Sequence, residues 1–295
     1  MTQTKEDAWE ERWRSEWYYS LMPLIIKGDG ERQEFKIEKL VRSLEHAGAD
    51  ADLSERIAEE IREGVIEGMT TTEIYKKAFQ LLHKHEHVAA ARYSMRRAIL
   101  DLGPTGFPFE DYVSELFRAQ GYETAARVVV QGRCIEHEVD VVMKKDGHTA
   151  GAELKFHNTP GLKTDVKIVL YVRARYWDIQ WGAEDRKERG IDEGILITNT
   201  KFTTSAERYA QCCGIRLIGW NYPYGAGLAD MIKNTGVYPV TVLTTLSRAE
   251  KIRLMAEGVA LCHDILRKPG AVEMLGLSSG KLESVLAETK AVCLT

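Results

Sequence analysis

The sequence HEVDVVMKKDGHTAGAELKF, residues 137–156, decides the fold of the middle of this chain. Two apolar runs, residues 139–143 and 150–154, flank the turn-forming residues Lys144-Lys145-Asp146-Gly147. Asp-Gly between two apolar runs is typical of a β-hairpin with a two-residue turn. The pattern therefore predicts two neighbouring antiparallel strands.

Charged side chains interrupt both predicted strands. Asp140 lies in the first, and Glu153 and Lys155 lie in the second. Because side chains alternate along a strand, Glu153 and Lys155 share one face and Leu154 points to the other. Hairpin pairing brings Asp140 near Glu153, and a divalent cation is the usual remedy for two buried carboxylates that repel each other. The alternative is an ordinary salt bridge on half-exposed strands.

These residue types are the ones that hydrolysis of a phosphodiester needs. Lys155 can orient or help to deprotonate the attacking water, and Mg²⁺ or Mn²⁺ can stabilise the charge that develops on the phosphate oxygens. Glu110, on a helix expected at residues 109–119, can supply a further metal ligand. We therefore predict Asp140, Glu153 and Glu110 as metal ligands, with Lys155 as the catalytic lysine.

The rest of the middle segment alternates between strand-like and helical patterns. Further strands are predicted at residues 126–130, 194–198 and 215–218, and further helices at 165–181 and 206–213. Such alternation indicates an α/β domain with a mixed sheet, which we place at residues 107–222.

Four segments of this domain carry a family resemblance: FEDYVSELFRAQGYET (109–124), HEVDVVM (137–143), AELKFH (152–157) and GILITNTKFTTSAERYAQCCGIRLIGW (194–220). Together they resemble an Mrr-like restriction endonuclease domain of the PD-(D/E)xK superfamily. The resemblance implies metal-dependent DNA cleavage, with the helix-borne acid at Glu110. Val139 stands where the superfamily's name has a proline.

Basic side chains near the predicted site are candidates for DNA contacts. His157 follows Lys155 at the second position and so shares its face, where it can touch the scissile phosphate. The alternative is a structural histidine. Four more cations on the following loop and helix are predicted to contact the DNA backbone, with a solvated helix face as the alternative: Lys163, Lys167, Arg173 and Arg175.

The segment before this domain is mostly helical. A short apolar run, residues 24–26, precedes the turn Lys27-Gly28-Asp29-Gly30, and apolar residues then recur at helical spacing. Thr70 to Thr72 with Glu73 is typical of a helix N-terminus. Gly103-Pro104-Thr105-Gly106 ends the segment as a linker, so we place this domain at residues 24–103.

Three stretches of this domain, IIKGDG (25–30), FKIEKL (35–40) and VAAARYSMR (88–96), resemble an ATP-cone, the allosteric nucleotide-binding module of many ribonucleotide reductases. The resemblance implies binding of ATP or dATP as an effector, with phosphate contacts from Lys27, Lys39, Arg92 and Arg96. Gly28 replaces a second basic residue that the family commonly has. No phosphate-binding loop of the Walker A type is present, so hydrolysis is not implied. The alternative is a small helical domain with scattered surface charge.

Both ends of the chain are expected to be helical. Residues 1–23 form an N-terminal extension in which Trp9, Trp13 and Trp17 recur at helical spacing, typical of a packing face. Residues 240–295 form a C-terminal helical domain. Its Leu-Gly-Leu-Ser turn leaves two roles open: a grip on the DNA backbone, or oligomerisation and capping.

Composition sets broad limits. The net charge of −4 over 295 residues argues against a simple basic nucleic-acid coat protein. No apolar stretch is long enough to cross a bilayer and no signal peptide is evident, so we expect a cytoplasmic protein. The five cysteines include no Cys-x-x-Cys pair, which indicates neither a disulfide framework nor a zinc ribbon.

The sequence thus predicts a multi-domain α/β protein: a nucleotide-regulated, divalent-metal-dependent DNA endonuclease that forms a homo-oligomer. Two settings stay open, defence against foreign DNA or the processing of damaged or modified DNA. The alternative is a catalytically silent, nucleotide-responsive DNA-binding regulator.

Overall fold

The computed structural model describes residues 23–103, 107–159, 161–268 and 270–293. The tryptophans of the predicted N-terminal extension lie outside the described residues. The chain divides between Leu81 and Leu82 into two compact units, which are described separately.

The first unit begins with a β-hairpin. β1 (Leu24–Ile26) pairs antiparallel with β2 (Arg32–Glu34). The turn closes with a hydrogen bond from the Gly30 N–H to the Lys27 carbonyl, 2.9 Å, and Gly30 has φ of 83°. A side chain at this φ is strained, so glycine is the natural residue here. The turn predicted from Lys27 to Gly30 is confirmed.

Three helices complete the first unit: α2 (Ile37–His46), α3 (Ala51–Glu63) and the greater part of α4 (Thr71–His85). Asp50 caps α3 by accepting a hydrogen bond from the Leu53 N–H, 2.7 Å. Thr70 and Glu73 cap α4 reciprocally, because the Thr70 N–H donates to Glu73 and the Glu73 N–H donates to the Thr70 hydroxyl. The cap predicted at this point is confirmed.

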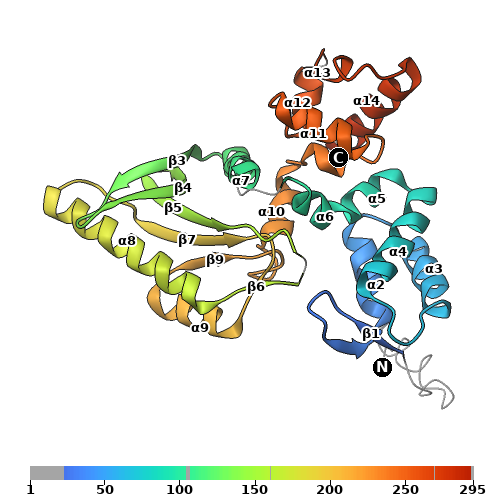
Figure 1. Ribbon diagram of the computed structural model, residues 1–295, viewed down its shortest axis with the longest axis horizontal. Helices are drawn as coiled ribbons and strands as arrows, with labels where there is room; N and C mark the ends of the chain where they lie inside the picture. The colour runs from blue at the N-terminus through green and yellow to red at the C-terminus, as the bar shows by residue number, and fades with distance from the viewer. Residues whose placement is uncertain (1–22, 104–106, 160, 269, 294–295) are drawn as a thin grey trace, which may run out of the picture. The chain divides into compact units, whose positions relative to one another are not determined.

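The second unit contains the five-stranded sheet, ordered β3-β4-β5-β7-β9 (Figure 1). Its strands are β3 (Glu123–Gln131), β4 (Glu136–Lys145), β5 (His148–Lys155), β7 (Glu193–Thr198) and β9 (Arg216–Ile218). The first three run antiparallel, whereas β5, β7 and β9 run parallel. The predicted mixed sheet is confirmed.

The β4–β5 hairpin is formed as the sequence predicts. Val141 pairs with Ala152 and Lys145 with His148, which leaves Asp146 and Gly147 as the two turn residues. Both have positive φ, 49° and 75°. This geometry matches the right-handed twist of the strands, and Asp-Gly adopts it readily.

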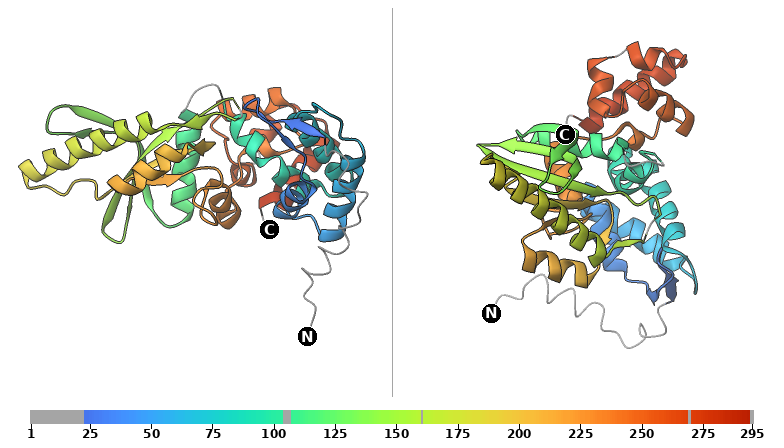
Figure 2. Two further views of the ribbon diagram at one scale, coloured as in Figure 1. Left: turned by 90° about the horizontal axis from the view of Figure 1, so that it is seen from below. Right: turned by 60° about the vertical axis from the view of Figure 1, so that its left-hand side comes forward.

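Helices cover both faces of the sheet. α7 (Phe107–Ala119) packs on one face, where Phe109 and Val113 join Val141 and Ala152 in a core that we call the α7 core. α8 (Val166–Arg186) and α9 (Thr204–Cys213) lie side by side on the other face, in what we call the α8 core (Figures 1 and 2).

Gly151 explains how closely α8 approaches the sheet. A Cβ atom on Gly151 would lie 2.8 Å from the ring and the hydroxyl of Tyr176, a residue of α8. Any side chain at this position would push α8 away from β5. The strand that carries Glu153 is thus held in place by helix packing as well as by strand pairing. A short parallel pair, β6 (Lys163–Thr164) with β8 (Lys201–Phe202), was not expected from the sequence.

The remainder of the second unit is helical. It consists of the end of α4, α5 (His87–Tyr93), α6 (Met95–Leu100), α10 (Leu228–Thr235), the 3-10 turn η1 (Val240–Val242), α11 (Arg248–Ala256), α12 (Cys262–Arg267), α13 (Gly270–Glu273) and α14 (Ser279–Cys293). The Thr241 hydroxyl donates to the Ala98 carbonyl and the Tyr112 hydroxyl donates to the Val237 carbonyl, 2.7 Å each. These bonds join the C-terminal helices to α6 and α7.

No helix among the described residues combines the length and the apolar character that a membrane span requires.

Candidate active site

Asp140 lies on β4 and is bonded directly to β5. Its carboxylate accepts a hydrogen bond from the Leu154 N–H, 2.7 Å. The register that pairs Val141 with Ala152 sets Asp140 opposite Glu153. The side chain is half-buried, and burial raises the pKa of Asp140 above its usual value. The hairpin thus brings Asp140 and Glu153 together.

Glu153 is the most perturbed carboxyl group of this cluster. Its side chain is 17% exposed, and its pKa is raised to about 7. Burial is the main cause, and the negative charge of Asp140 adds to it. The positive charges of Arg175 and Lys155 act in the opposite direction. A carboxyl group so disfavoured as an anion gains from any further cation placed beside it.

Glu110 approaches the same cluster from α7. Its side chain is 12% exposed and lies 3.2 Å from the Arg127 guanidinium. Burial raises the pKa of Glu110, and the charge of Asp140 raises it further. Asp140 therefore lies within electrostatic reach of both other acids, Glu110 and Glu153.

The chemistry of this donor set fits a hard divalent cation. Carboxylate oxygens are the ligands that Mg²⁺ and Mn²⁺ prefer in proteins. Across the described parts of the chain, no three His, Cys, Asp or Glu side chains lie in one group that could hold a metal ion. The three predicted ligands, Asp140, Glu153 and Glu110, are therefore not gathered into one such group in this structure.

Lys155 follows Glu153 on the same strand. Leu154 packs against the α7 core, so Glu153 and Lys155 lie on the opposite face, as alternation along the strand predicts. The Lys155 side chain is exposed, and its backbone carbonyl accepts a hydrogen bond from the Thr198 hydroxyl, 2.8 Å. Its ammonium group is therefore free to meet a ligand beside the acids.

Arg175 is the principal counter-ion of Glu153. Its guanidinium contacts the Glu153 carboxylate, donates to the Glu138 carbonyl at 2.9 Å, and lies over the Tyr171 ring. Its side chain is 10% exposed. In this structure Arg175 thus faces the acids rather than the solvent, whereas the sequence predicts it as a DNA contact. Nothing in the local sequence pattern indicates this pairing.

His157 lies in a polar network that the sequence did not indicate. Its N–H donates to the Asn199 side chain and its carbonyl accepts from the same side chain, 2.8 Å each. Its imidazole Nε2 is 3.0 Å from the Thr164 hydroxyl. Burial lowers the pKa of His157, so the neutral ring is favoured. The signal for this network was Thr198-Asn199-Thr200, a polar run directly after the apolar strand β7.

The other three predicted DNA contacts lie on the surface of this domain. Lys163 on β6 and Lys167 in the first turn of α8 are exposed. Arg173 is half-buried and its guanidinium stacks over the Trp177 ring, 4.6 Å from the centroid.

The predicted nucleotide contacts are divided between the two units. In the first, Lys27 forms salt bridges with Glu31 at 2.5 Å and Asp29 at 3.9 Å, and the hydrogen bond to Glu31 raises the pKa of Lys27. Lys39 is exposed on α2. In the second unit, Arg92 and Arg96 are half-buried on α5 and α6, and burial lowers the pKa of Arg96.

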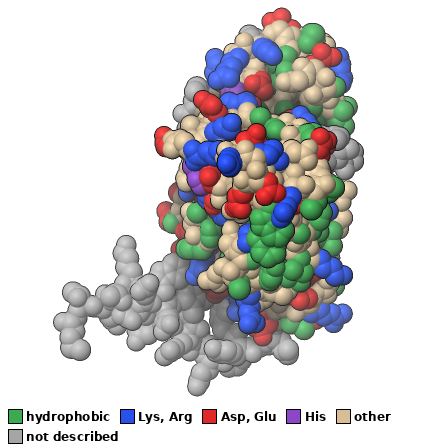
Figure 3. Space-filling view, turned by 90° about the vertical axis from the view of Figure 1, so that its left-hand side faces the viewer, with side chains coloured by type: hydrophobic (Ala, Val, Ile, Leu, Met, Phe, Trp, Pro, Cys, Tyr) green, Lys and Arg blue, Asp and Glu red, His purple; other side chains and the backbone are tan. Residues whose placement is uncertain are grey.

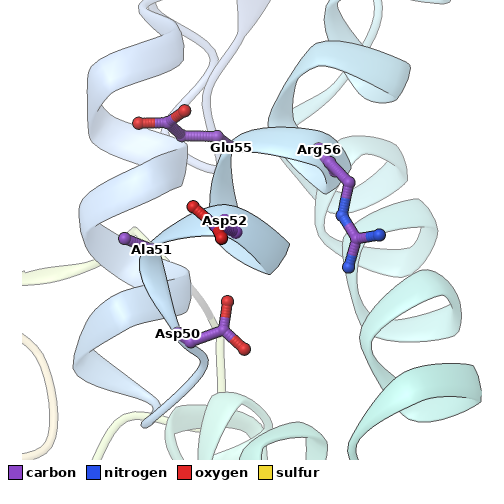
Figure 4. A pocket seen from close by; sticks show the side chains of 5 residues that line it. All are labelled: Asp50, Ala51, Asp52, Glu55 and Arg56. Atoms are coloured by element: carbon purple, nitrogen blue, oxygen red, sulfur yellow. The ribbon is translucent and has the colours of Figure 1, made fainter.

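An open pocket of about 710 Å³ lies at the start of α3 in the first unit (Figure 4). Its lining residues are Asp50, Ala51, Asp52, Glu55 and Arg56. Three carboxylates against one guanidinium make a poor receptor for nucleotide phosphates, which require several cations. The pocket therefore does not provide an alternative to the predicted lysines.

Comparison with protein families agrees with this architecture. The ATP cone domain model matches residues 23–101, the restriction endonuclease model Mrr_cat matches residues 104–222, and the model for the C-terminal part of AF1548-like proteins matches residues 238–293. The chain therefore combines an ATP-cone with a restriction-endonuclease-type α/β domain and a helical C-terminal domain.

Two relatives place the chain in a particular family. An uncharacterized protein of Archaeoglobus fulgidus is 35% identical over 181 residues, which are 61% of this chain and 99% of that protein. The crystal structure of AF1548, a protein of unknown function, is 33% identical with a TM-score of 0.52, over 65% of this chain and 100% of that one. The chain belongs to the AF1548-like family.

Two weaker structural likenesses accompany these. Can2 from Sulfobacillus thermosulfidooxidans, in complex with cyclic tetra-adenylate, is 12% identical with a TM-score of 0.32 over 70% of this chain and 64% of that one. The MspJI restriction endonuclease, in complex with an oligonucleotide, is 15% identical with a TM-score of 0.26 over 68% and 48%. Likenesses at this level do not establish a common fold.

Proposed function

We propose that this chain is a nucleotide-regulated, divalent-metal-dependent DNA endonuclease. The observation that carries the proposal is the group formed by Asp140, Glu153 and Lys155 on β4 and β5. Burial beside Asp140 raises the pKa of Glu153 to about 7, and a free ammonium group stands next to the two acids. The restriction-endonuclease family match over the same residues supports it.

Each residue has a distinct role in this proposal. Asp140 and Glu153 would hold the cation, and Glu110 would contribute to its binding directly or through water. When bound, the cation supplies Lewis-acid stabilisation of the charge on the phosphodiester oxygens. Lys155 would donate a hydrogen bond that orients the attacking water, and its positive charge would favour loss of that water's proton to solvent. Because Leu154 holds Asp140 through its N–H, the two strands keep the acids in register with Lys155.

Exposed cations that follow the site in the sequence supply the affinity for DNA. Lys163 and Lys167 lie on β6 and at the start of α8, beyond Lys155 on the chain, and both are exposed. His157, Arg173 and Arg175 remain candidates for a role with the substrate. The side chains of His157 and Arg175 contact Thr164 and Glu153 of the same chain. Contact with DNA would require these side chains to exchange those intramolecular contacts for contacts with DNA.

The ATP-cone supplies the regulation in this proposal. ATP or dATP binds through Lys27 and Lys39, with Arg92 and Arg96 as further candidates, and controls cleavage through the packing of a homo-oligomer. Lys27 forms its salt bridges with acids of its own turn, Asp29 and Glu31, so a triphosphate must displace them. Such a nuclease would serve in the cytoplasm, either in defence against foreign DNA or in the processing of damaged or modified DNA.

A cleavage assay tests the proposal. Plasmid, phage and methylated DNA are incubated with the full chain and Mg²⁺ or Mn²⁺, with and without ATP and dATP. We expect metal-dependent cleavage that Lys155→Ala abolishes and that nucleotide changes in rate. Equal cleavage by the parent and by Lys155→Ala would show that the site is elsewhere. Metal-independent DNA binding without cleavage would favour a silent DNA-binding regulator instead.

A further inference from the structure

The outer face of α8 carries an unusual amount of apolar surface. Its inner face, which includes Val169, Tyr176 and Ile179, packs in the α8 core. Leu170, Trp177 and Trp181 are 46%, 45% and 44% exposed. With about 100° of rotation per residue, these three project from the side of the helix opposite to the core. Figure 3 shows hydrophobic side chains gathered in one patch on the face that it presents.

The spacing of these residues is that of a helix-pairing seam. Leu170, Ala174, Trp177 and Trp181 are separated by four, three and four residues, and Ala174 is exposed as well. Apolar residues repeated in this way occupy the a and d positions of a coiled coil and form one stripe along a helix. A second helix would pack against this stripe and cover its apolar side chains.

The seam ends in opposite charges. One heptad step before Ala174 stands Lys167, and one step after Trp177 stands Glu184. Both side chains are exposed. Turning the helix end for end about the middle of the seam exchanges Lys167 with Glu184, Leu170 with Trp181, and Ala174 with Trp177.

We propose that α8 binds α8 of a second copy of this chain in an antiparallel pair. The layers of the interface are Lys167 against Glu184 of the partner subunit, Leu170 against Trp181 of the partner subunit, and Ala174 against Trp177 of the partner subunit. Each layer joins opposite charges or a smaller apolar side chain with a larger one. A parallel pair would instead set Lys167 against its own copy and Trp181 against its own copy, so the antiparallel arrangement is favoured.

Local contacts hold the aromatic surface ready for a partner. Trp177 and Trp181 stack at 5.6 Å with an angle of 12°, and Arg173 covers Trp177 from one side. Ile135, 61% exposed, lies beside the helix because its N–H donates to the Asp178 carboxylate at 3.4 Å. It widens the apolar surface beyond the seam. Preordered aromatic side chains lose little entropy when they are covered, so they suit a protein interface.

Charge reversal tests this pairing most sharply. Sedimentation velocity of the full chain over a range of concentrations measures the dimer dissociation constant for the parent, Lys167→Glu, Glu184→Lys and the double variant. We expect at least a tenfold weaker dimer for each single variant, because each places like charges against each other at both ends of the seam. In the double variant the opposite charges are restored, and we expect the dimer to return to within a factor of three of the parent.

Trp181→Glu provides a second measurement. It buries a charge against Leu170 of the partner subunit, so we expect the chain to become monomeric while its circular dichroism stays that of the parent. A parent that is monomeric throughout, a dimer indifferent to Trp181→Glu, or a double variant as weak as the single ones would overturn the proposal. So would a Trp181→Glu variant with an unchanged oligomeric state and lost DNA binding, which would make the tryptophans a stacking surface for bases.

Discussion

The carboxylate of Asp140 accepts a hydrogen bond from the backbone N–H of Leu154 at 2.7 Å. This bond ties the acid of β4 to the point on β5 that lies between Glu153 and Lys155. The side chain of Asp140 therefore has a structural and a chemical role, and the two are separable by mutation. Asparagine keeps an oxygen acceptor for the Leu154 N–H but lacks the negative charge.

Asp140→Asn is expected to retain the fold and to lose cleavage. A neutral amide is a poor ligand for a divalent cation, so cleavage at saturating Mg²⁺ should fall by about 100-fold or more. The melting temperature should stay close to that of the parent. Asp140→Ala, which also removes the hydrogen bond, should in addition lower the free energy of unfolding by about 1 kcal/mol. If Asp140→Asn cleaves at the parental rate, Asp140 is not a ligand.

Lys155→Ala tests the lysine. Its ammonium is exposed, so its removal should change the melting temperature little, while cleavage falls by about 100-fold or more because the attacking water loses its partner. Lys144→Ala is the matched control, since Lys144 is an exposed lysine at the other end of the same hairpin. Similar losses in both variants would indicate a general effect of charge on DNA binding instead.

Arg175→Ala should increase the response of the protein to metal ions. Without the guanidinium, the half-buried Glu153 carboxyl loses its main cationic partner. The free energy of unfolding of the metal-free variant should therefore be about 2 kcal/mol lower than that of the parent. Mn²⁺ should then raise the melting temperature more in the variant than in the parent, because the cation no longer competes with Arg175. Differential scanning fluorimetry with EDTA or Mn²⁺ measures this. Arg173→Ala, which removes a guanidinium from the outer face of α8, should show the parental response.

The sequence predicted the hairpin well because its signals are local. Alternation along β4 and β5 and the Asp146-Gly147 turn fix the register, and the register sets Asp140 opposite Glu153. Local sequence signals do not predict the counter-ion of Glu153. Arg175 reaches Glu153 only because α8 packs closely over Gly151, which is a consequence of tertiary packing between segments roughly 20 residues apart on the chain.

The same limit applies to the outer face of α8 and to the nucleotide residues. The heptad spacing from Leu170 to Trp181 is visible in the sequence, but only the packed core shows which side of the helix faces solvent. For the ATP-cone, the resemblance assigns Lys27 and Lys39 a phosphate role. The acids that pair with Lys27 in the structure are sequence neighbours that the resemblance leaves unmentioned.

Glu288 is expected to hold the C-terminal helices together. Its carboxylate on α14 accepts four hydrogen bonds, from the N–H and hydroxyl groups of Thr244 and Thr245, at 2.5 to 2.9 Å. Glu288→Ala removes the partner of both backbone N–H groups and of the Thr245 hydroxyl, while the Thr244 hydroxyl keeps the His83 ring at 3.3 Å; the loss should cost about 3 kcal/mol. The melting temperature should fall by roughly 10 °C, with a smaller fall for Glu288→Gln. Glu283→Ala, at an exposed position on the same helix, is the control. An equal, small effect of both alanine variants would contradict the assignment.

Because of Glu250, part of the free energy of unfolding varies with pH in the acid range. Its carboxylate caps α11 and accepts from Lys281 at 2.7 Å, and these hydrogen bonds, the one from Lys281 first, lower the pKa of Glu250 to about 2. An acid whose pKa is lower in the folded state stabilises the fold above its unfolded pKa, about 4.3, and this contribution disappears as the pH falls toward the folded value. Lys281→Ala should therefore lower the free energy of unfolding by less than about 1 kcal/mol at pH 7, because the pair is partly exposed.

The difference between the parent and Lys281→Ala should shrink as the pH falls from about 5 to about 2, where protonation removes the carboxylate from both proteins. Urea unfolding at several pH values measures it. Lys290→Ala, which removes an exposed lysine from the same helix, should give an offset that does not vary in this way. A Lys281→Ala difference that stays constant down to about pH 2 would show that the lysine acts through packing of its methylene chain, not through the charge of Glu250.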